Sequence, residues 1–218
     1  ERIPWEVEVV SETEQPISAD QMEFSAWVKW LDGDQPPSLR VYNYATKQYQ
    51  ELTPDKSPAK KGEWTRLSLK FPTPGENDEL EVILQCARNY GTCKTAWDRV
   101  ILTQTVGGVG TNLLAFRNGD FEDADHLKYW HKWDYDNGNF DVQAQNDVVY
   151  DPTPGWALLM TDTDPGQTIS SYSQKLTIAQ GKQAVEARGY AFEVAGATPA
   201  PRLSPGGSSL VQLKLKNT

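Results

Sequence analysis

The sequence is poor in the residues on which most catalytic and metal sites depend. Its 218 residues include only two histidines, two cysteines and two methionines. His126 and His131 do not form an HExxH pattern, and no GxSxG nucleophile elbow occurs. Neighbouring carboxylates do not indicate a glycosidase pair, because 30 acidic residues bring some of them together in any case. We therefore expect a protein that is not an enzyme.

Positive charge and long apolar runs are also scarce. The 21 basic residues against 30 acidic ones give a net charge of -9, and no basic patch offers a nucleic-acid backbone a partner. No apolar run approaches the roughly 18 residues of a membrane helix, and residues 1–10 lack the basic and apolar regions of a signal peptide. We expect a soluble, mature chain without nucleic-acid partners or membrane insertion.

The two cysteines are close in sequence. Cys86 and Cys93 bracket ARNYGT, and the glycine in this loop allows the chain to fold back far enough to join the two sulfurs. The alternative is a pair of reduced buried thiols. A metal site is not indicated, because no second cysteine pair or nearby histidine supplies further ligands. A disulfide would place the protein outside the reducing cytoplasm, at an extracellular or cell-surface location.

Short segments of alternating apolar and polar residues recur along the chain, and none has helical periodicity over more than a turn. In residues 22–30 the even positions are apolar, which predicts a strand with one face in the core. The other predicted strands are residues 5–10, 39–44, 64–71, 80–86, 97–102, 156–161, 172–178, 185–194 and 210–216. Gly181 and Lys182 are interpreted as a turn. The pattern predicts an all-β protein.

A short glycine-rich segment, VGGVGT at residues 106–111, lies almost midway along the chain. Its spacing does not fit a dinucleotide fingerprint, and no phosphate-loop lysine follows. We interpret it as a flexible linker. It would divide the chain into two β-sandwich modules, residues 1–105 and residues 112–218.

Three sequence motifs carry a family resemblance. Residues 112–123, NLLAFRNGDFED, resemble the opening strand of jelly-roll carbohydrate-binding modules, the galactose-binding-like β-sandwiches attached to bacterial polysaccharide-degrading enzymes. Residues 61–74, KGEWTRLSLKFPTP, and residues 97–102, WDRVIL, resemble the closing strands of the same family. The resemblance implies tandem jelly-roll sandwiches that bind glycans.

The two halves also resemble each other, but out of phase with the chain ends. Strand lengths and turn positions match when Trp27 is aligned with Tyr190. By this pattern the first module lacks its opening strand and the second lacks its closing strands. The chain is then a piece of a longer array, or its halves close on each other as one permuted sandwich, or a neighbouring chain supplies the missing strands.

We expect the open edges to be completed by the other half or by the next subunit. The evidence for this would be ladder hydrogen bonds from residues 210–216 to a strand outside the second half. The same closure would bring Asp98 near Glu122.

The family resemblance implies a structural Ca²⁺ held by Glu122, with Asp120 as a further ligand, and by Asp98 of the other half. An EF-hand at residues 134–145 is not indicated, because its glycine is one place early and Gln145 stands where a bidentate glutamate belongs.

Aromatic rings on the polar side of the predicted strands suggest a glycan site, since flat rings stack on pyranose rings while polar side chains bond the hydroxyls. The candidate carbohydrate-binding residues are Trp27, Lys29, Arg40, Tyr42, Tyr44, Gln85, Arg188 and Tyr190. The alternative is that these rings pack beneath loops or at a contact between subunits.

The sequence therefore predicts a non-catalytic extracellular glycan-binding protein whose partner is a polysaccharide. The alternative is a structural subunit of an extracellular filament or surface layer. In that case neighbouring subunits of the same protein are the partners, and they assemble by strand complementation.

Overall fold

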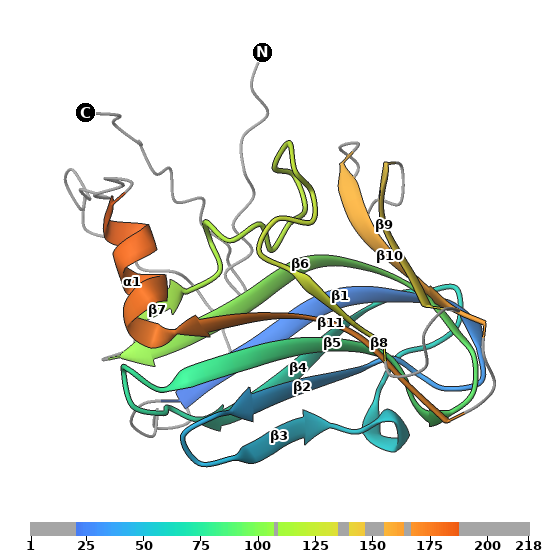
Figure 1. The fold of residues 1–218 in the computed structure, drawn as a ribbon, viewed down its shortest axis with the longest axis horizontal. Helices are drawn as coiled ribbons and strands as arrows, with labels where there is room; N and C mark the ends of the chain where they lie inside the picture. Colours follow the sequence, from blue (N-terminus) through green and yellow to red (C-terminus); the bar gives the residue numbers. More distant parts are fainter. Residues whose placement is uncertain (1–20, 107–108, 135–139, 147–154, 164–166, 188–218) are drawn as a thin grey trace, which may run out of the picture.

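The computed structural model describes residues 21–106, 109–134, 140–146, 155–163 and 167–187 (Figure 1). The strands predicted at residues 5–10 and 210–216 lie outside the described residues, as does the ladder expected from the latter. Two antiparallel sheets form a β-sandwich, which confirms the predicted all-β class. In the described part of the chain, no helix is long and apolar enough to cross a bilayer.

Sheet A has the strand order β4-β1-β6-β10-β9, with β7 also paired to β6. Its strands are β1 (Gln21–Gly33), β4 (Trp64–Pro72), β6 (Cys93–Val106), β7 (Val109–Asn112), β9 (Phe140–Asn146) and β10 (Trp156–Asp162). Sheet B has the order β3-β2-β5-β11-β8. Its strands are β2 (Ser38–Asn43), β3 (Gln48–Leu52), β5 (Glu79–Tyr90), β8 (His131–Asp134) and β11 (Gln167–Thr177). A 3₁₀ turn, η1 (Pro54–Lys56), follows β3, and helix α1 (Ile178–Ala187) follows β11.

The core lies between the sheets and is built from the alternating apolar positions. In β1 the side chains of Met22, Phe24, Ala26 and Val28 are buried, as their spacing predicts. The remaining buried apolar residues of the core include Leu39, Val41, Leu67, Phe71, Leu80, Val82, Leu84, Trp97, Leu102, Leu158, Tyr172 and Leu176. The core is contiguous across both halves of the chain.

Each sheet contains strands from both halves of the chain, and the two halves meet at one strand pair in each sheet. In sheet A, β10 pairs with β6, and Leu158 lies opposite Trp97. In sheet B, β11 pairs with β5, and Tyr172 lies opposite Leu84 (Figure 1). In the described residues, strands of the first half therefore pair with strands of the second half in both sheets.

The glycine-rich segment at 106–111 does not separate two sandwiches in this part of the chain. Its described residues belong to an antiparallel hairpin of β6 with β7, in which Val106 lies opposite Val109. The segment was predicted to be a flexible linker, and the cross-strand pairing between its two sides corrects this for the described residues.

Residues 113–120, predicted as an opening strand, instead form a series of turns. Asn118 and Phe121 have positive φ values of 54° and 59°, which lie outside the range of regular strand backbone. Leu113, Leu114 and Phe121 are nevertheless buried in the core, and the ring centroid of Phe121 lies 5.7 Å from that of Trp130. The resemblance to an opening strand thus did not predict the backbone conformation of this segment.

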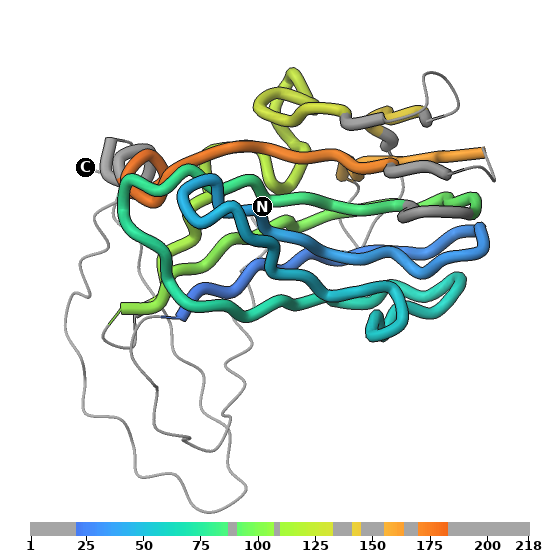
Figure 2. The backbone as a smooth tube through the Cα atoms, turned by 60° about the horizontal axis from the view of Figure 1, so that its bottom comes forward, coloured from blue at the N-terminus to red at the C-terminus, as the bar shows by residue number. Residues whose placement is uncertain are grey.

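Residues 178–187 form helix α1 where a strand end, a turn and the start of another strand were predicted. Thr177 and Gln180 form a reciprocal capping box: the backbone N–H of Gln180 donates to Thr177 Oγ1, and that of Thr177 donates to Gln180 Oε1. The helix packs so closely against Leu113 that position 181 has no room for a side chain. A Cβ on Gly181 would lie only 2.7 Å from the Cβ of Leu113. Figure 2 shows this helix beside the turn between β4 and β5, where Lys182 Nζ lies 2.6 Å from Glu76 Oε1.

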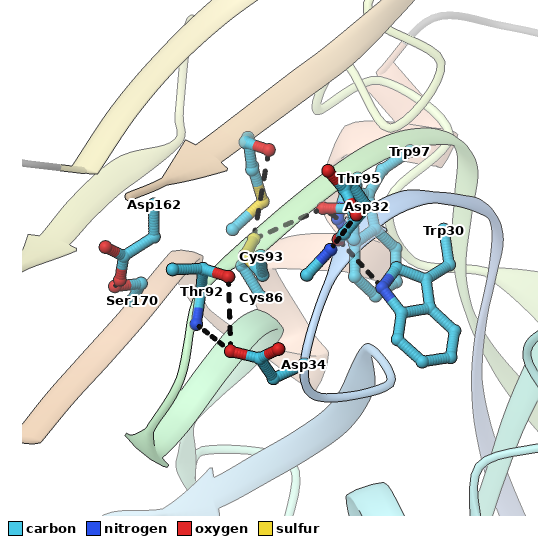
Figure 3. Close-up of a disulfide and its surroundings, with 12 residues drawn as sticks. Trp30, Asp32, Asp34, Cys86, Thr92, Cys93, Thr95, Trp97, Asp162 and Ser170 are labelled. Carbon is cyan, nitrogen blue, oxygen red and sulfur yellow. Dashed lines mark hydrogen bonds between the residues drawn. A yellow bond between two sulfur atoms is a disulfide. The ribbon is translucent and has the colours of Figure 1, made fainter. Parts of the chain in front are cut away.

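A disulfide joins Cys86 of β5 to Cys93 of β6, as predicted, with the two Cα atoms 5.7 Å apart (Figure 3). Because β5 belongs to sheet B and β6 to sheet A, the bond ties the two layers together at one end. The hydroxyl of Thr95 donates to Cys86 Sγ and accepts a bond from Trp97 Nε1 at 2.9 Å. The disulfide is thus part of a buried polar cluster that includes a core tryptophan.

Candidate functional site

The predicted carbohydrate-binding residues are divided between the two outer faces of the sandwich. Trp27 and Lys29 alternate with the buried residues of β1 and therefore face outward from sheet A. Arg40 and Tyr42 alternate with the buried residues of β2 and face outward from sheet B. These four residues therefore do not share one face, because the chain changes sheets between β1 and β2.

Tyr44 and Gln85 lie on the same side of sheet B as Tyr42. Tyr44 follows the end of β2, and its ring meets that of Tyr42 edge-on with centroids 4.7 Å apart. Gln85 alternates with buried core residues of β5 and accepts a hydrogen bond from Ser38 of β2. Arg188 and Tyr190 lie outside the described residues.

Tyr49 of β3 completes an aromatic group that the sequence analysis missed. It lies directly opposite Tyr42 in the β2–β3 hairpin, and the two ring centroids are 4.6 Å apart. The turn carries a sequence signal: Asn43 Oδ1 accepts the backbone N–H groups of residues 45 and 46, an Asx turn that reverses the chain. We call the surface formed by Arg40, Tyr42, Tyr44, Tyr49, Glu51, Glu79, Glu81 and Lys175 the tyrosine face.

Cations lie against two of the three rings. The Arg40 guanidinium lies 3.9 Å from the centroid of Tyr49, and its Nε is 3.2 Å from Glu51 Oε2. Lys175 Nζ of β11 lies 4.0 Å from the centroid of Tyr44. These cation–π contacts fix the orientation of the rings, while Tyr49 keeps half of its surface exposed.

Glu81 is held by hydroxyl groups from both sides. The phenol of Tyr44 donates to Glu81 Oε2 at 2.6 Å, and the hydroxyl of Ser173 donates to Oε1 at 2.6 Å. Burial and the bond to Glu81 raise the pKa of the Tyr44 phenol above its usual 10, so at neutral pH Tyr44 keeps the proton that it donates. The hydrogen bond with Tyr44 raises the pKa of Lys175 above 10.5, so its ammonium stays charged. The Tyr44 phenol and the Lys175 ammonium therefore both keep their protons at neutral pH.

The residues predicted to hold calcium lie near one another beside sheet A, where β6 carries a bulge. Between Ser25 and Trp27 the β1–β6 register shifts, and Arg99 takes a positive φ of 47°. The backbone N–H of Val100 donates to the carbonyl of Gly119 at 2.7 Å. A Cβ on Gly119 would lie 2.2 Å from the carbonyl oxygen of Val100, so only glycine allows this approach.

This contact brings the Asn-Gly-Asp turn next to Asp98. Burial, together with the charges of Glu122 and Asp120, raises the pKa of Asp98 to about 6 against the opposing hydrogen bond from the Arg99 N–H. Glu122 Oε1 also accepts the backbone N–H of Trp156 at 2.6 Å, which ties the turn to β10. The three carboxyl groups are thus close enough for their charges to interact.

Carboxylate oxygens are the ligands that calcium prefers, so the chemistry of this set suits the ion. Among the described residues, however, no group of three or more His, Cys, Asp or Glu side chains is arranged to hold a metal. The three side chains as they stand do not form a coordination shell, and calcium here stays a prediction.

Comparisons with protein-family models, with curated proteins and with solved structures find no match for this chain.

Proposed function

We propose that this protein is a non-catalytic glycan-binding β-sandwich of the extracellular space or cell surface, with the tyrosine face as its binding site. The observation that carries the proposal is the contiguous group of three tyrosine rings on the outer face of sheet B, one of them half exposed. Exposed rings of this kind stack on the apolar faces of sugar rings, and the fixed carboxylate beside them can accept hydroxyl hydrogen bonds.

The sequence motifs and the disulfide support the same proposal. The sandwich architecture agrees with the resemblance to carbohydrate-binding modules at the level of fold class. A buried disulfide between the sheets is typical of a protein that folds in an oxidising compartment.

The test compares variants on the two outer faces by affinity electrophoresis in gels that contain soluble polysaccharides. Tyr49→Ala should weaken retention about tenfold, because it removes the most exposed ring of the group. Trp27→Ala, on the outer face of sheet A, is the matched aromatic control and should keep wild-type retention. Far-UV circular dichroism and a thermal melt of each variant show that the fold is intact.

Loss of retention in Trp27→Ala but not in Tyr49→Ala would move the site to sheet A. Absence of retention on every polysaccharide would remove glycan binding altogether. In that case the structural-subunit alternative would be tested by light scattering of the purified protein, where growth of particles with concentration indicates polymerisation.

A further inference from the structure

We infer that the tyrosine face selects uncharged glycans over polyanionic ones, and that Glu81 is the residue that sets this selectivity. The inference rests on the proposed function, because it names the class of glycan that the same site accepts.

The cations of the tyrosine face are already neutralised. Arg40 forms an ion pair with Glu51, and Lys175 Nζ lies 3.7 Å from Glu79 Oε1. The Arg40 side chain is only 11% exposed and is held against the Tyr49 ring, so it cannot turn outward to a carboxylate or sulfate. An anionic sugar would have to compete with these carboxylates for each cation.

Glu81 leaves the face with one negative charge in excess. The face carries two cations, and its three carboxylates are Glu51, Glu79 and Glu81. The two hydroxyl donors that hold Glu81 orient its oxygens without neutralising them. The net charge of -9 on the whole chain adds to the repulsion of polyanions.

Each oxygen of Glu81 keeps capacity for a second hydrogen bond, since a carboxylate offers about four lone-pair sites. A sugar hydroxyl can donate to such an oxygen, and a bond to a charged acceptor is about twice as strong as one between neutral groups. A sulfate or an ionised carboxylate has no hydrogen to donate and is repelled. Tyr42 lies directly opposite Glu81 in the β2–β5 pairing, so a sugar stacked on the rings lies within reach of the carboxylate.

The experiment uses matched polysaccharide pairs that differ only in charge: dextran with dextran sulfate, and a neutral galactan with its sulfated counterpart. Retention in affinity gels is measured for the wild type, for Glu81→Gln and for Glu63→Gln. Glu63 is exposed and precedes β4 of sheet A, so its replacement makes the same charge change away from the tyrosine face.

The wild type is expected to bind at least one neutral polymer and to bind its sulfated partner at least about tenfold more weakly. Glu81→Gln should bind the neutral polymer about tenfold more weakly, which corresponds to the loss of one charge-assisted hydrogen bond. The difference in affinity between the neutral polymer and its sulfated partner should also become smaller. Glu63→Gln should behave as the wild type.

Stronger binding of the sulfated polymer, or wild-type selectivity in Glu81→Gln, would overturn the inference while leaving glycan binding in place. Failure to bind any neutral or sulfated polymer would overturn the proposed function and the inference with it. Thermal melts of both variants distinguish loss of selectivity from loss of fold.

Discussion

Replacing Asp98 with asparagine is expected to stabilise the folded protein at pH 7 and to remove part of its pH dependence. The side chain is only 9% exposed, lies at the β6 bulge and has two acidic neighbours in the Asn-Gly-Asp turn. An amide of the same shape removes the charge and keeps an oxygen that can accept the 2.6 Å hydrogen bond from the Arg99 N–H.

The magnitude follows from the pKa of Asp98. Burial raises this pKa from its ordinary value of 3.8 to about 6, and one pKa unit corresponds to about 1.4 kcal/mol. The folded state therefore binds the proton more tightly than the unfolded state, by about 3 kcal/mol. This stabilisation is fully present below pH 3.8 and is lost as the pH rises through about 6. Above that pH the neutral Asp98→Asn side chain recovers up to about 3 kcal/mol.

The assay is urea unfolding followed by tryptophan fluorescence at several pH values between 4 and 7.5, in the presence of a chelator. A gain of about 3 kcal/mol in the free energy of unfolding raises the urea midpoint at pH 7 by about 1 M or more, because this free energy falls by roughly 1–3 kcal/mol per molar urea. The difference between variant and wild type should shrink toward pH 4. Glu63→Gln, an exposed position, controls for the change in net charge.

The reasoning would be refuted if Asp98→Asn were less stable than the wild type at pH 7, or if its stability varied with pH between 4 and 7 as steeply as that of the wild type. Either result would mean that the carboxylate of Asp98 is stabilised in the fold. A cation bound during purification would have this effect, so the chelator is essential.

If Asp98, Asp120 and Glu122 turn toward a shared calcium ion, added calcium should raise the melting temperature of the wild type but not that of Asp98→Asn. An equal increase in both proteins would place any bound calcium elsewhere. Replacing both Cys86 and Cys93 with alanine should reduce the free energy of unfolding by about 2.5 kcal/mol, because the disulfide limits the entropy of the unfolded chain over a separation of seven residues. Free thiols detected by alkylation of the native wild type would contradict the disulfide. Gly119→Ala should destabilise the protein by about 3 kcal/mol or more, because its Cβ would clash with the Val100 carbonyl. Gly62→Ala should destabilise it less, because its Cβ contacts nothing within 4 Å and only the strain of the positive φ remains. Equal midpoints for the two glycine variants in urea would show that the turn does not sit against β6.

The sequence alone determined which side of β1, β2 and β5 faces the core, because a strand has a period of two residues and the apolar residues of these three strands follow it. It also determined the disulfide, since the two cysteines are separated by only seven positions. It did not reveal which sheet each strand joins. That choice depends on pairing between residues far apart in the chain, such as Tyr172 with Leu84, and local periodicity carries no information about it.

Only the tertiary structure decided the composition of the candidate sites. It placed Trp27 and Tyr42 on opposite faces, brought Tyr49 and Glu81 beside Tyr42, and set Asp98 next to the turn at Gly119. The capping box of α1 was readable in the sequence as Thr-x-x-Gln, but alternation along residues 172–178 favoured a strand and hid it. Alternation favoured a strand and the capping box favoured a helix, and the packing of α1 against Leu113 selected the helix. Glycine at position 181 lets the backbone of α1 approach that of Leu113 closely.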